Sequence, residues 1–125
     1  IFFSMNIKSK VLLIFTISLI GSCSPNQDQL KVMKNGVITW RSETGEKIVT
    51  QFYSLSDNSL KFVKVVLPDG KEYTLPQVVS ASGVRYTDER EIVFWMKGEM
   101  AFVQQRAPSG EWQILSNNCR VITEP

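Results

Sequence analysis

Apolar and polar residues alternate with a period of two from Val37 to Ile122, and turn residues interrupt the pattern at short intervals. The first four segments with this pattern are VITWR (37–41), EKIVTQFYS (46–54), SLKFVKVVL (59–67) and KEYTL (71–75). Four more follow, which are GVRYTD (83–88), EIVFWMK (91–97), EMAFVQQ (99–105) and EWQILSNNCRVI (111–122). A period of two is typical of β-strands whose two faces meet different surroundings. The pattern therefore predicts about eight short strands.

The breaks between these segments suit tight turns, as in Pro68-Asp69-Gly70 and Pro108-Ser109-Gly110. Proline presets φ, aspartate caps the turn and glycine accepts a positive φ. Short strands at such spacing favour a sandwich or a closed barrel, and a barrel leaves no exposed edges. We predict an all-β fold, a small antiparallel β-barrel of about eight strands. The residues expected in its core are Trp40, Phe52, Phe62, Val66, Phe94, Phe102 and Leu115.

The N-terminal part of the chain has a different pattern, in which Lys8 and Lys10 precede the apolar run 11–20. As a helix this run would rise about 15 Å, roughly half of the hydrocarbon core of a bilayer. It is therefore too short for a transmembrane anchor and indicates a secretory signal peptide. We expect residues 1–22 to be this signal peptide, with residues 1–4 upstream of the true start at Met5.

The end of the predicted signal peptide, Ile20-Gly21-Ser22-Cys23, resembles the bacterial lipobox. The resemblance implies that Cys23 is lipidated and becomes the first mature residue; the alternative is an ordinary signal peptide that contains a cysteine. Residues 23–34 would then be the lipidated cysteine and its tether, and residues 35–125 the barrel domain. This arrangement predicts a lipoprotein of the bacterial cell envelope that faces the periplasm. Ser24 stands where an aspartate marks inner-membrane retention in some bacteria, which favours the outer membrane.

The composition argues against several classes of function. Of the 14 Lys and Arg residues two lie in the predicted signal peptide, which has no acid, so the remainder is balanced by the 12 Asp and Glu residues. No bulk charge would attract this domain to nucleic acid. The chain has no histidine, the usual general base near neutral pH and the commonest transition-metal ligand. We therefore expect no enzyme activity, no cofactor and no metal.

Several short motifs in the second half of the chain occur in a characteristic order. They are the turn Leu67-Pro68-Asp69-Gly70, then Ser82-Gly83-Val84-Arg85-Tyr86, then Trp95-Met96-Lys97-Gly98, and finally Ala101. In order and spacing they resemble the family of membrane-bound inhibitors of c-type lysozyme, over roughly residues 35–121. The resemblance implies an eight-stranded antiparallel barrel that binds c-type lysozyme and blocks it.

The resemblance also implies which residues contact lysozyme. In the family, the serine of Ser-Gly-x-x-Tyr and the lysine of Lys-Gly enter the active-site cleft of the enzyme, and here these are Ser82 and Lys97. The further contacts that we predict are Gly83, Arg85, Tyr86 and Gly98. A retaining glycosidase uses two carboxyl groups ~5 Å apart. An ammonium placed between them and a hydroxyl that donates a hydrogen bond would satisfy both groups.

One departure from the family pattern concerns a disulfide, which family members form between the first strand region and a cysteine near the C-terminus. Cys119 fits the second position, but Ser42 stands about where its partner should be. The resemblance therefore implies that the bridge is missing, at a cost of about 3–5 kcal/mol of stability in the chain-entropy account. Whether Cys119 is inert or pairs between molecules stays open, as does the oligomeric state.

Other interpretations of the same residues remain open. Ser-Gly before a strand is ordinary turn chemistry, Tyr86 and Trp95 can be packing residues, and Arg85 can pair with an acid such as Asp88 or Glu99. A catalytic Ser82–Lys97 pair is conceivable, since a desolvated lysine can act as a base, but no nucleophile elbow surrounds the serine. The second hypothesis for function is a lipoprotein that binds a small molecule or glycan at a barrel mouth lined by Trp40, Tyr86 and Trp95. The third is a purely structural envelope lipoprotein.

Overall fold

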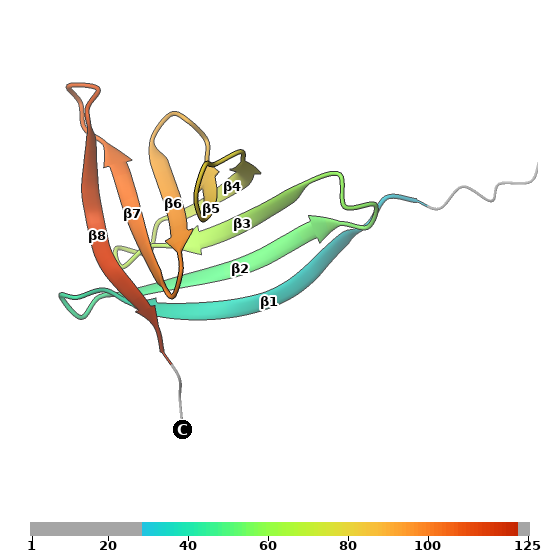
Figure 1. The fold of residues 1–125 in the computed structure, drawn as a ribbon, viewed down its shortest axis with the longest axis horizontal. Coiled ribbons are helices and arrows are strands. Elements are labelled where there is room, and N and C mark those ends of the chain that lie inside the picture. The colour runs from blue at the N-terminus through green and yellow to red at the C-terminus, as the bar shows by residue number, and fades with distance from the viewer. Residues whose placement is uncertain (1–28, 123–125) are drawn as a thin grey trace, which may run out of the picture.

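Eight antiparallel strands follow one another in chain order around a closed barrel in the computed structural model, which describes residues 29–122 (Figure 1). They are β1 (Val32–Arg41), β2 (Lys47–Leu55), β3 (Lys61–Val66), β4 (Glu72–Val78), β5 (Val84–Thr87), β6 (Ile92–Lys97), β7 (Met100–Arg106) and β8 (Trp112–Val121). The predicted all-β barrel is confirmed, and β1 begins five residues earlier than the pattern indicated.

The predicted signal peptide, the lipidation at Cys23 and the first part of the tether lie outside the described residues. Within residues 29–122 no helix is long and apolar enough to cross a bilayer.

The barrel closes through a short contact between the ends of β1 and β8. Trp40 pairs with Val121 and Arg41 with Arg120, whereas β1 and β2 pair over almost their whole length. The first part of β1 therefore has a strand neighbour on one side only among the described residues.

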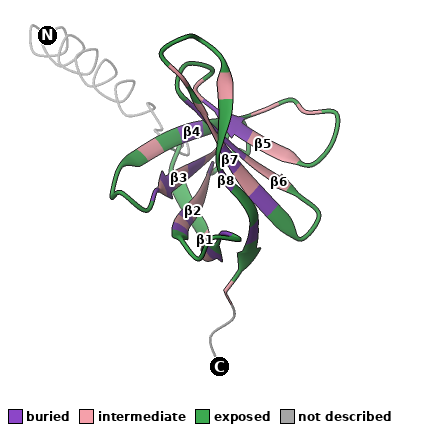
Figure 2. Ribbon diagram, turned by 90° about the vertical axis from the view of Figure 1, so that its left-hand side faces the viewer, coloured by how far each residue is buried: buried purple, intermediate pink, exposed green. Residues whose placement is uncertain are grey.

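The core is filled by the inward-facing residues of every strand, most of them medium-sized (Figure 2). Phe94 is fully buried, and the indole ring of Trp40 meets its ring edge-on with centroids 5.8 Å apart. The indole Nε1 of Trp40 donates to Thr50 Oγ1 at 2.9 Å, and this hydroxyl donates to the carbonyl of Ile38 at 2.9 Å. The Trp40 N–H and the Thr50 hydroxyl are therefore both satisfied, which avoids the penalty for burying a lone donor.

The predicted core is confirmed for Trp40 and Phe94, and Phe52 packs against the core from a partly buried position. It is wrong for Phe62, Val66 and Phe102, which are only partly buried. Their inward-facing neighbours are instead small residues, which are Val63, Val65, Ala101 and Val103. Alternation defines two faces of each strand without saying which one points inward, and the interior of so narrow a barrel is filled by the smaller side chains.

Leu115 was also predicted to be buried, and its side chain is 44% exposed. The cause is a register shift between β7 and β8, where Val103 pairs with Ser116 and Gln104 with Ile114. Leu115 is thus the extra residue of a bulge, which interrupts the alternation of the strand.

Cys119 is a buried, free cysteine beside the turn that joins β1 to β2. Burial raises the pKa of its thiol to about 11, with a further contribution from the charges of Glu43 and Glu46. The β1–β8 register, Trp40 with Val121 and Arg41 with Arg120, places the buried Ser42 opposite Cys119 when it is extended by one residue. Opposed residues of antiparallel strands have Cα atoms about 4.5–5.5 Å apart, within the range of a disulfide.

We therefore predict that Ser42→Cys forms a disulfide with Cys119 under oxidising conditions. Because this bridge closes most of the domain into one loop, it should stabilise the fold by up to about 3–5 kcal/mol. Denaturant unfolding with and without a reductant measures the gain, and Ser109→Cys in a distant exposed turn is the control. Free thiols that persist in oxidised Ser42→Cys, or an unfolding midpoint that does not respond to reductant, would contradict the predicted geometry.

Candidate functional site

Lys97 lies at the end of β6, where a tight turn leads directly into β7. Lys97 pairs with Met100, so that Gly98 and Glu99 form a two-residue hairpin loop. Gly98 adopts a φ of 60°, which such a turn requires and glycine accepts without strain. Lys97, Gly98 and Glu99 are all exposed. The hairpin therefore presents the lysine to solvent.

Ser82 and Gly83 lie beside Lys97, in the bend that leads into β5. Val84 pairs with Met96, and extending this register by one residue sets Gly83 opposite Lys97. Gly83 has a φ of 68°, and a Cβ atom on it would overlap the carbonyl oxygen of Met96. Only glycine fits this approach, so the structure brings the two predicted residues Ser82 and Lys97 together.

The side chain of Trp95 contacts both Ser82 and Lys97. Its indole Nε1 donates to the carbonyl oxygen of Ser82 at 2.9 Å, and the Lys97 Nζ lies 4.2 Å from the centroid of its ring. Phe102, which pairs with Trp95 across β6 and β7, lies 5.4 Å away between centroids and also faces the ammonium, at 5.7 Å. Arg85 Cζ lies 5.4 Å from the Trp95 centroid. The outer face of β5, β6 and β7 is thus an aromatic platform that carries two cations.

The hydroxyl of Ser82 has no hydrogen-bond partner among residues 29–122, although its carbonyl oxygen accepts two hydrogen bonds. One comes from Trp95 and the other from the hydroxyl of Ser80 at 2.6 Å. The backbone at Ser82 is therefore fixed while its exposed side chain remains able to bond to another molecule.

Neither Lys97 nor Arg85 forms an ion pair within the described part of the chain. The salt bridge found there joins Lys64 and Glu72. The alternatives of Asp88 or Glu99 as partners of Arg85 are therefore not realised. Desolvation raises the pKa of the Asp88 carboxyl, but backbone N–H groups of Glu91, Arg90 and Ile92 bond to it and lower its pKa below the usual value. This carboxylate organises the β5–β6 turn.

The other predicted contacts occupy different positions. Gly98 and Gly83 are exposed and Arg85 is half-buried on the outer face. Tyr86 is only 5% exposed and packs between Phe52 and Phe94. The structure thus supports the interpretation of Tyr86 as a packing residue, because its side chain has little surface left for a partner.

Sequence reasoning treated Trp95 as packing and missed its contacts with Ser82 and Lys97. Residues two apart in a strand share a face, so the pairing of Trp95 with Lys97 could have been derived from the sequence. The bond from Trp95 to Ser82 could not, because it depends on the register between β5 and β6.

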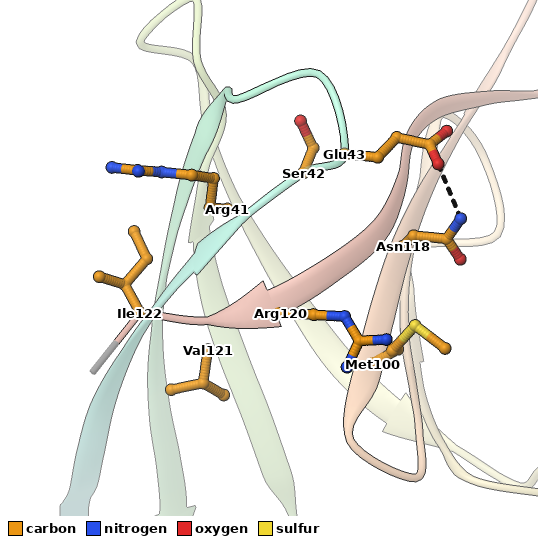
Figure 3. Close-up of a pocket in the computed structure, with 8 residues that line it drawn as sticks. All are labelled: Arg41, Ser42, Glu43, Met100, Asn118, Arg120, Val121 and Ile122. Carbon is orange, nitrogen blue, oxygen red and sulfur yellow. Dashed lines mark hydrogen bonds between the residues drawn. The ribbon is translucent and has the colours of Figure 1, made fainter.

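A hollow on the outer surface lies beside the same hairpin, where β1 meets β8 (Figure 3). Met100 pairs with Arg120 and lies against it, whereas the side chain of Arg41 points away from both. On the opposite wall Asn118 Nδ2 donates to Glu43 Oε2 at 2.7 Å.

Within residues 29–122 no group of three or more His, Cys, Asp or Glu side chains is placed to hold a metal ion.

The aromatic residues proposed for a ligand-binding mouth do not converge. Trp40 is 3% exposed and Tyr86 is 5% exposed, both inside the core, whereas Trp95 lies on the outer face. The hypothesis of a small-molecule or glycan site at a barrel mouth therefore loses its structural basis.

Comparisons with known proteins point to one family. The sequence model of the family described as membrane-bound lysozyme-inhibitor of c-type lysozyme matches residues 40–112. A membrane-bound lysozyme inhibitor of C-type lysozyme from Yersinia enterocolitica is 41% identical over 76 residues, 61% of this chain and 59% of that protein. The match thus spans less than two thirds of the Yersinia protein. A protein of the same name from Escherichia coli is 31% identical over 112 residues, 90% of this chain and 92% of that protein.

A solved structure shares the fold. It is the crystal structure of Pseudomonas aeruginosa MliC in complex with hen egg white lysozyme, with a TM-score of 0.53 and 21% sequence identity over 80% of this chain and 91% of that chain. At this identity the similarity establishes the barrel architecture only.

The close approach at Gly83 generates a prediction about the loop that carries Ser82. Gly83→Ala should destabilise the fold by about 1–2 kcal/mol through its positive φ and by a further 1–3 kcal/mol or so because the Met96 carbonyl must move. Gly110→Ala is the matched control, since Gly110 also has a positive φ, of 92°, but open space around its Cβ position. Denaturant unfolding compares the two variants. Equal losses of stability would show that the approach to Met96 is not tight.

Proposed function

The chain belongs to the family of membrane-bound inhibitors of c-type lysozyme, which are inhibitors and not enzymes, and from this premise we propose that it blocks the active-site cleft of c-type lysozyme with Ser82 and Lys97. The observation that carries the proposal is the pair of unsatisfied groups on the Trp95 platform. The Lys97 ammonium has no acidic partner and the Ser82 hydroxyl has no hydrogen-bond partner within residues 29–122.

These two groups match the chemistry of a retaining glycosidase cleft. Such an enzyme places two carboxyl groups ~5 Å apart, and one of them is ionised during turnover. The Lys97 ammonium provides a compact positive charge on a long stem, and the Ser82 hydroxyl provides a donor for the second carboxyl group. An inhibitor that satisfies both carboxyl groups removes them from catalysis and excludes the substrate.

The platform contributes by holding the lysine before the enzyme arrives. An exposed cation–π contact is worth about 0.5–1 kcal/mol, which is enough to restrict the side chain without neutralising its charge. An acidic neighbour in place of Trp95 would satisfy the ammonium internally and reduce its attraction to the enzyme. Restricting Lys97 in advance lowers the entropy lost on binding.

We further propose that the protein is a lipoprotein anchored through Cys23 and exposed to the periplasm, most consistently at the outer membrane. The lipobox-like sequence before Cys23 and the membrane-bound character named for both relatives support this placement. Residues 1–22 would be the removed signal peptide, and the anchor and tether would run from Cys23 to the start of β1, which begins the inhibitory domain at Val32 and so shortens the predicted tether of residues 23–34.

Inhibition should depend strongly on Lys97 and less strongly on Ser82. Lys97→Ala leaves an enzyme carboxylate unpaired in a desolvated cleft, which costs about 2–4 kcal/mol, or roughly 30- to 1000-fold in the inhibition constant. Ser82→Ala removes one hydrogen bond and should weaken inhibition by roughly 5- to 30-fold. The chain from Ser24 onward, titrated against a c-type lysozyme that digests cell-wall substrate, provides the measurement.

Two exposed residues at distant turns supply matched controls for these variants, Lys71→Ala for the lysine and Ser109→Ala for the serine. Both should inhibit like the unchanged protein. If the folded, unchanged chain fails against several c-type lysozymes, the proposed function is wrong. If it inhibits equally well without Lys97 and Ser82, the partner is correct and the proposed contact is wrong.

The variant Trp95→Phe separates the effect of the Trp95 hydrogen bond from the effect of its aromatic ring. This variant keeps an aromatic face under Lys97 but removes the N–H that bonds to the Ser82 carbonyl. We expect inhibition to weaken by roughly 5- to 10-fold, about the value of one hydrogen bond. Phe102→Leu, which leaves that bond intact, is the comparison. An unchanged inhibition constant for Trp95→Phe would show that the bond does not position Ser82.

A further inference from the structure

The start of β1 exposes an unusual run of apolar side chains. Leu30 is 56% exposed, Val32 is 60% exposed and Met33 is 48% exposed. Because Val32 and Met33 are neighbours in a strand, they point to opposite faces, so neither face of β1 is covered here. Lys31 and Lys34, which lie between and after them, are exposed as well.

The short closure of the barrel explains this exposure. β8 pairs with β1 only at Trp40 and Arg41, so the first part of β1 pairs with β2 alone. Among the described residues nothing covers the other edge or the two faces of this segment. Exposed apolar residues that occur singly need no explanation, but several in succession on an open strand mark a surface that contacts something.

The neighbouring turn between β2 and β3 also exposes apolar and basic side chains. It is fixed to the start of β1 by two hydrogen bonds, from Ser56 N to the Lys31 carbonyl at 2.8 Å and from Lys31 N to Ser56 Oγ at 2.9 Å. The turn adds Leu60, which is 42% exposed, and the exposed Lys61. Its acidic residue, Asp57, accepts hydrogen bonds from the hydroxyl and the N–H of Ser59, which lower the pKa of the carboxyl.

We propose that the entry surface, which consists of residues 30–34 with Leu60 and Lys61, docks on an anionic phospholipid bilayer. Apolar side chains interspersed with lysines fit the boundary between lipid headgroups and acyl chains, where the lysines meet phosphate and the apolar groups leave water. The charges of the three lysines exceed that of Asp57, so the surface is complementary to anionic lipid.

The shortness of the tether supports a lipid bilayer as the partner that covers the entry surface. This step rests on the anchor at Cys23 that is part of the proposed function. Six residues lie between Cys23 and Leu30, and a fully extended chain over this distance spans at most about 25 Å. The entry surface is therefore the part of the described barrel that follows the anchor most closely, and it cannot move far from the bilayer.

Docking in this way would orient the inhibitory site. The opposite end of β1 reaches Trp40, which lines a hollow together with Gly98 of the β6–β7 hairpin. The eight steps along the strand from Val32 to Trp40 span about 26 Å. Figure 1 shows the start of β1 at one side of the molecule and the β6–β7 hairpin away from it. The Ser82–Lys97 site would thus point away from the membrane, where a soluble enzyme can reach it.

The test uses the lipidated full-length protein reconstituted in vesicles, with an environment-sensitive fluorophore attached to Val32→Cys. Cys119 is buried with a thiol pKa of about 11, and Cys23 is occupied by lipid, so the label attaches to the introduced thiol. Ile114→Cys near the start of β8 is the matched position, because Ile114 is also an exposed aliphatic residue, at 51%. Quenching by nitroxide-labelled phospholipid reports contact with the bilayer.

We expect strong quenching and a blue shift at position 32 in vesicles that contain phosphatidylglycerol, weaker effects in phosphatidylcholine alone, and little quenching at position 114. Lys31→Glu with Lys34→Glu should reduce the quenching at position 32 to the level of position 114, whereas Lys71→Glu with Arg90→Glu should leave it unchanged. High salt should weaken the quenching because it screens the attraction between lysines and lipid.

Equal quenching at both positions would overturn the proposal, since the anchor alone would then account for the proximity. A blue shift at position 32 that grows with protein concentration and needs no lipid would also overturn it, in favour of a second copy of the chain. A protein that carries no lipid at Cys23 and stays off the vesicles removes the premise and rejects the proposal. None of these outcomes affects inhibition of lysozyme, which is measured separately in solution.

Discussion

The contact of Trp95 with both Ser82 and Lys97 is the interaction on which the site depends. One indole fixes the backbone of Ser82 through its N–H and supports the Lys97 ammonium on its ring. Ser82 lies in the bend before β5 and Lys97 at the end of β6, and Trp95 is the side chain that contacts both. The glycine at position 83 is the second requirement, because any side chain there would collide with the carbonyl of Met96 and separate the strands that Trp95 joins.

This arrangement is possible because the barrel assigns its large aromatic residues to both faces. Phe94 and Trp40 fill the interior, while Trp95 and Phe102 pair on the outside. Small inward-facing residues such as Ala101 leave the narrow interior fully packed, so the outer aromatics are not needed for the core. A closed sheet with a filled interior is stiff. It therefore holds the external platform in one geometry, as the proposed insertion into a rigid enzyme cleft requires.

The positions of the strands could be predicted from the sequence because alternation and turn residues are local signals. Each predicted strand occurs within a few residues of its expected place, and the resemblance to the lysozyme inhibitors singled out Ser82 and Lys97, which the structure brings close together. Three features were not accessible, for related reasons. Alternation does not say which face of β3 and β7 points inward, Leu115 falls on a bulge, and the bond from Trp95 to Ser82 depends on register. Pairing between strands is a property of the whole sheet, so a single segment does not encode it.

The short contact between β1 and β8 affects both the stability of the barrel and the position of the Lys97 hairpin relative to the start of β1. Closing the barrel through Trp40 and Arg41 alone leaves the rest of β1 free, and the same short contact is where Ser42 lies opposite the unpaired Cys119. A bridge at this point would lock the closure covalently, whereas this chain relies on two residue pairs, the packing of Trp40 and hydrogen bonds such as that from Asn118 to Glu43. The consequence is a barrel whose closure lies beside the hairpin that carries Lys97. The free part of β1 follows the predicted anchor. The hairpin that carries Lys97 and the exposed segment of β1 thus lie at opposite ends of one strand, so the geometry that weakens the closure also separates the proposed site from the proposed membrane contact.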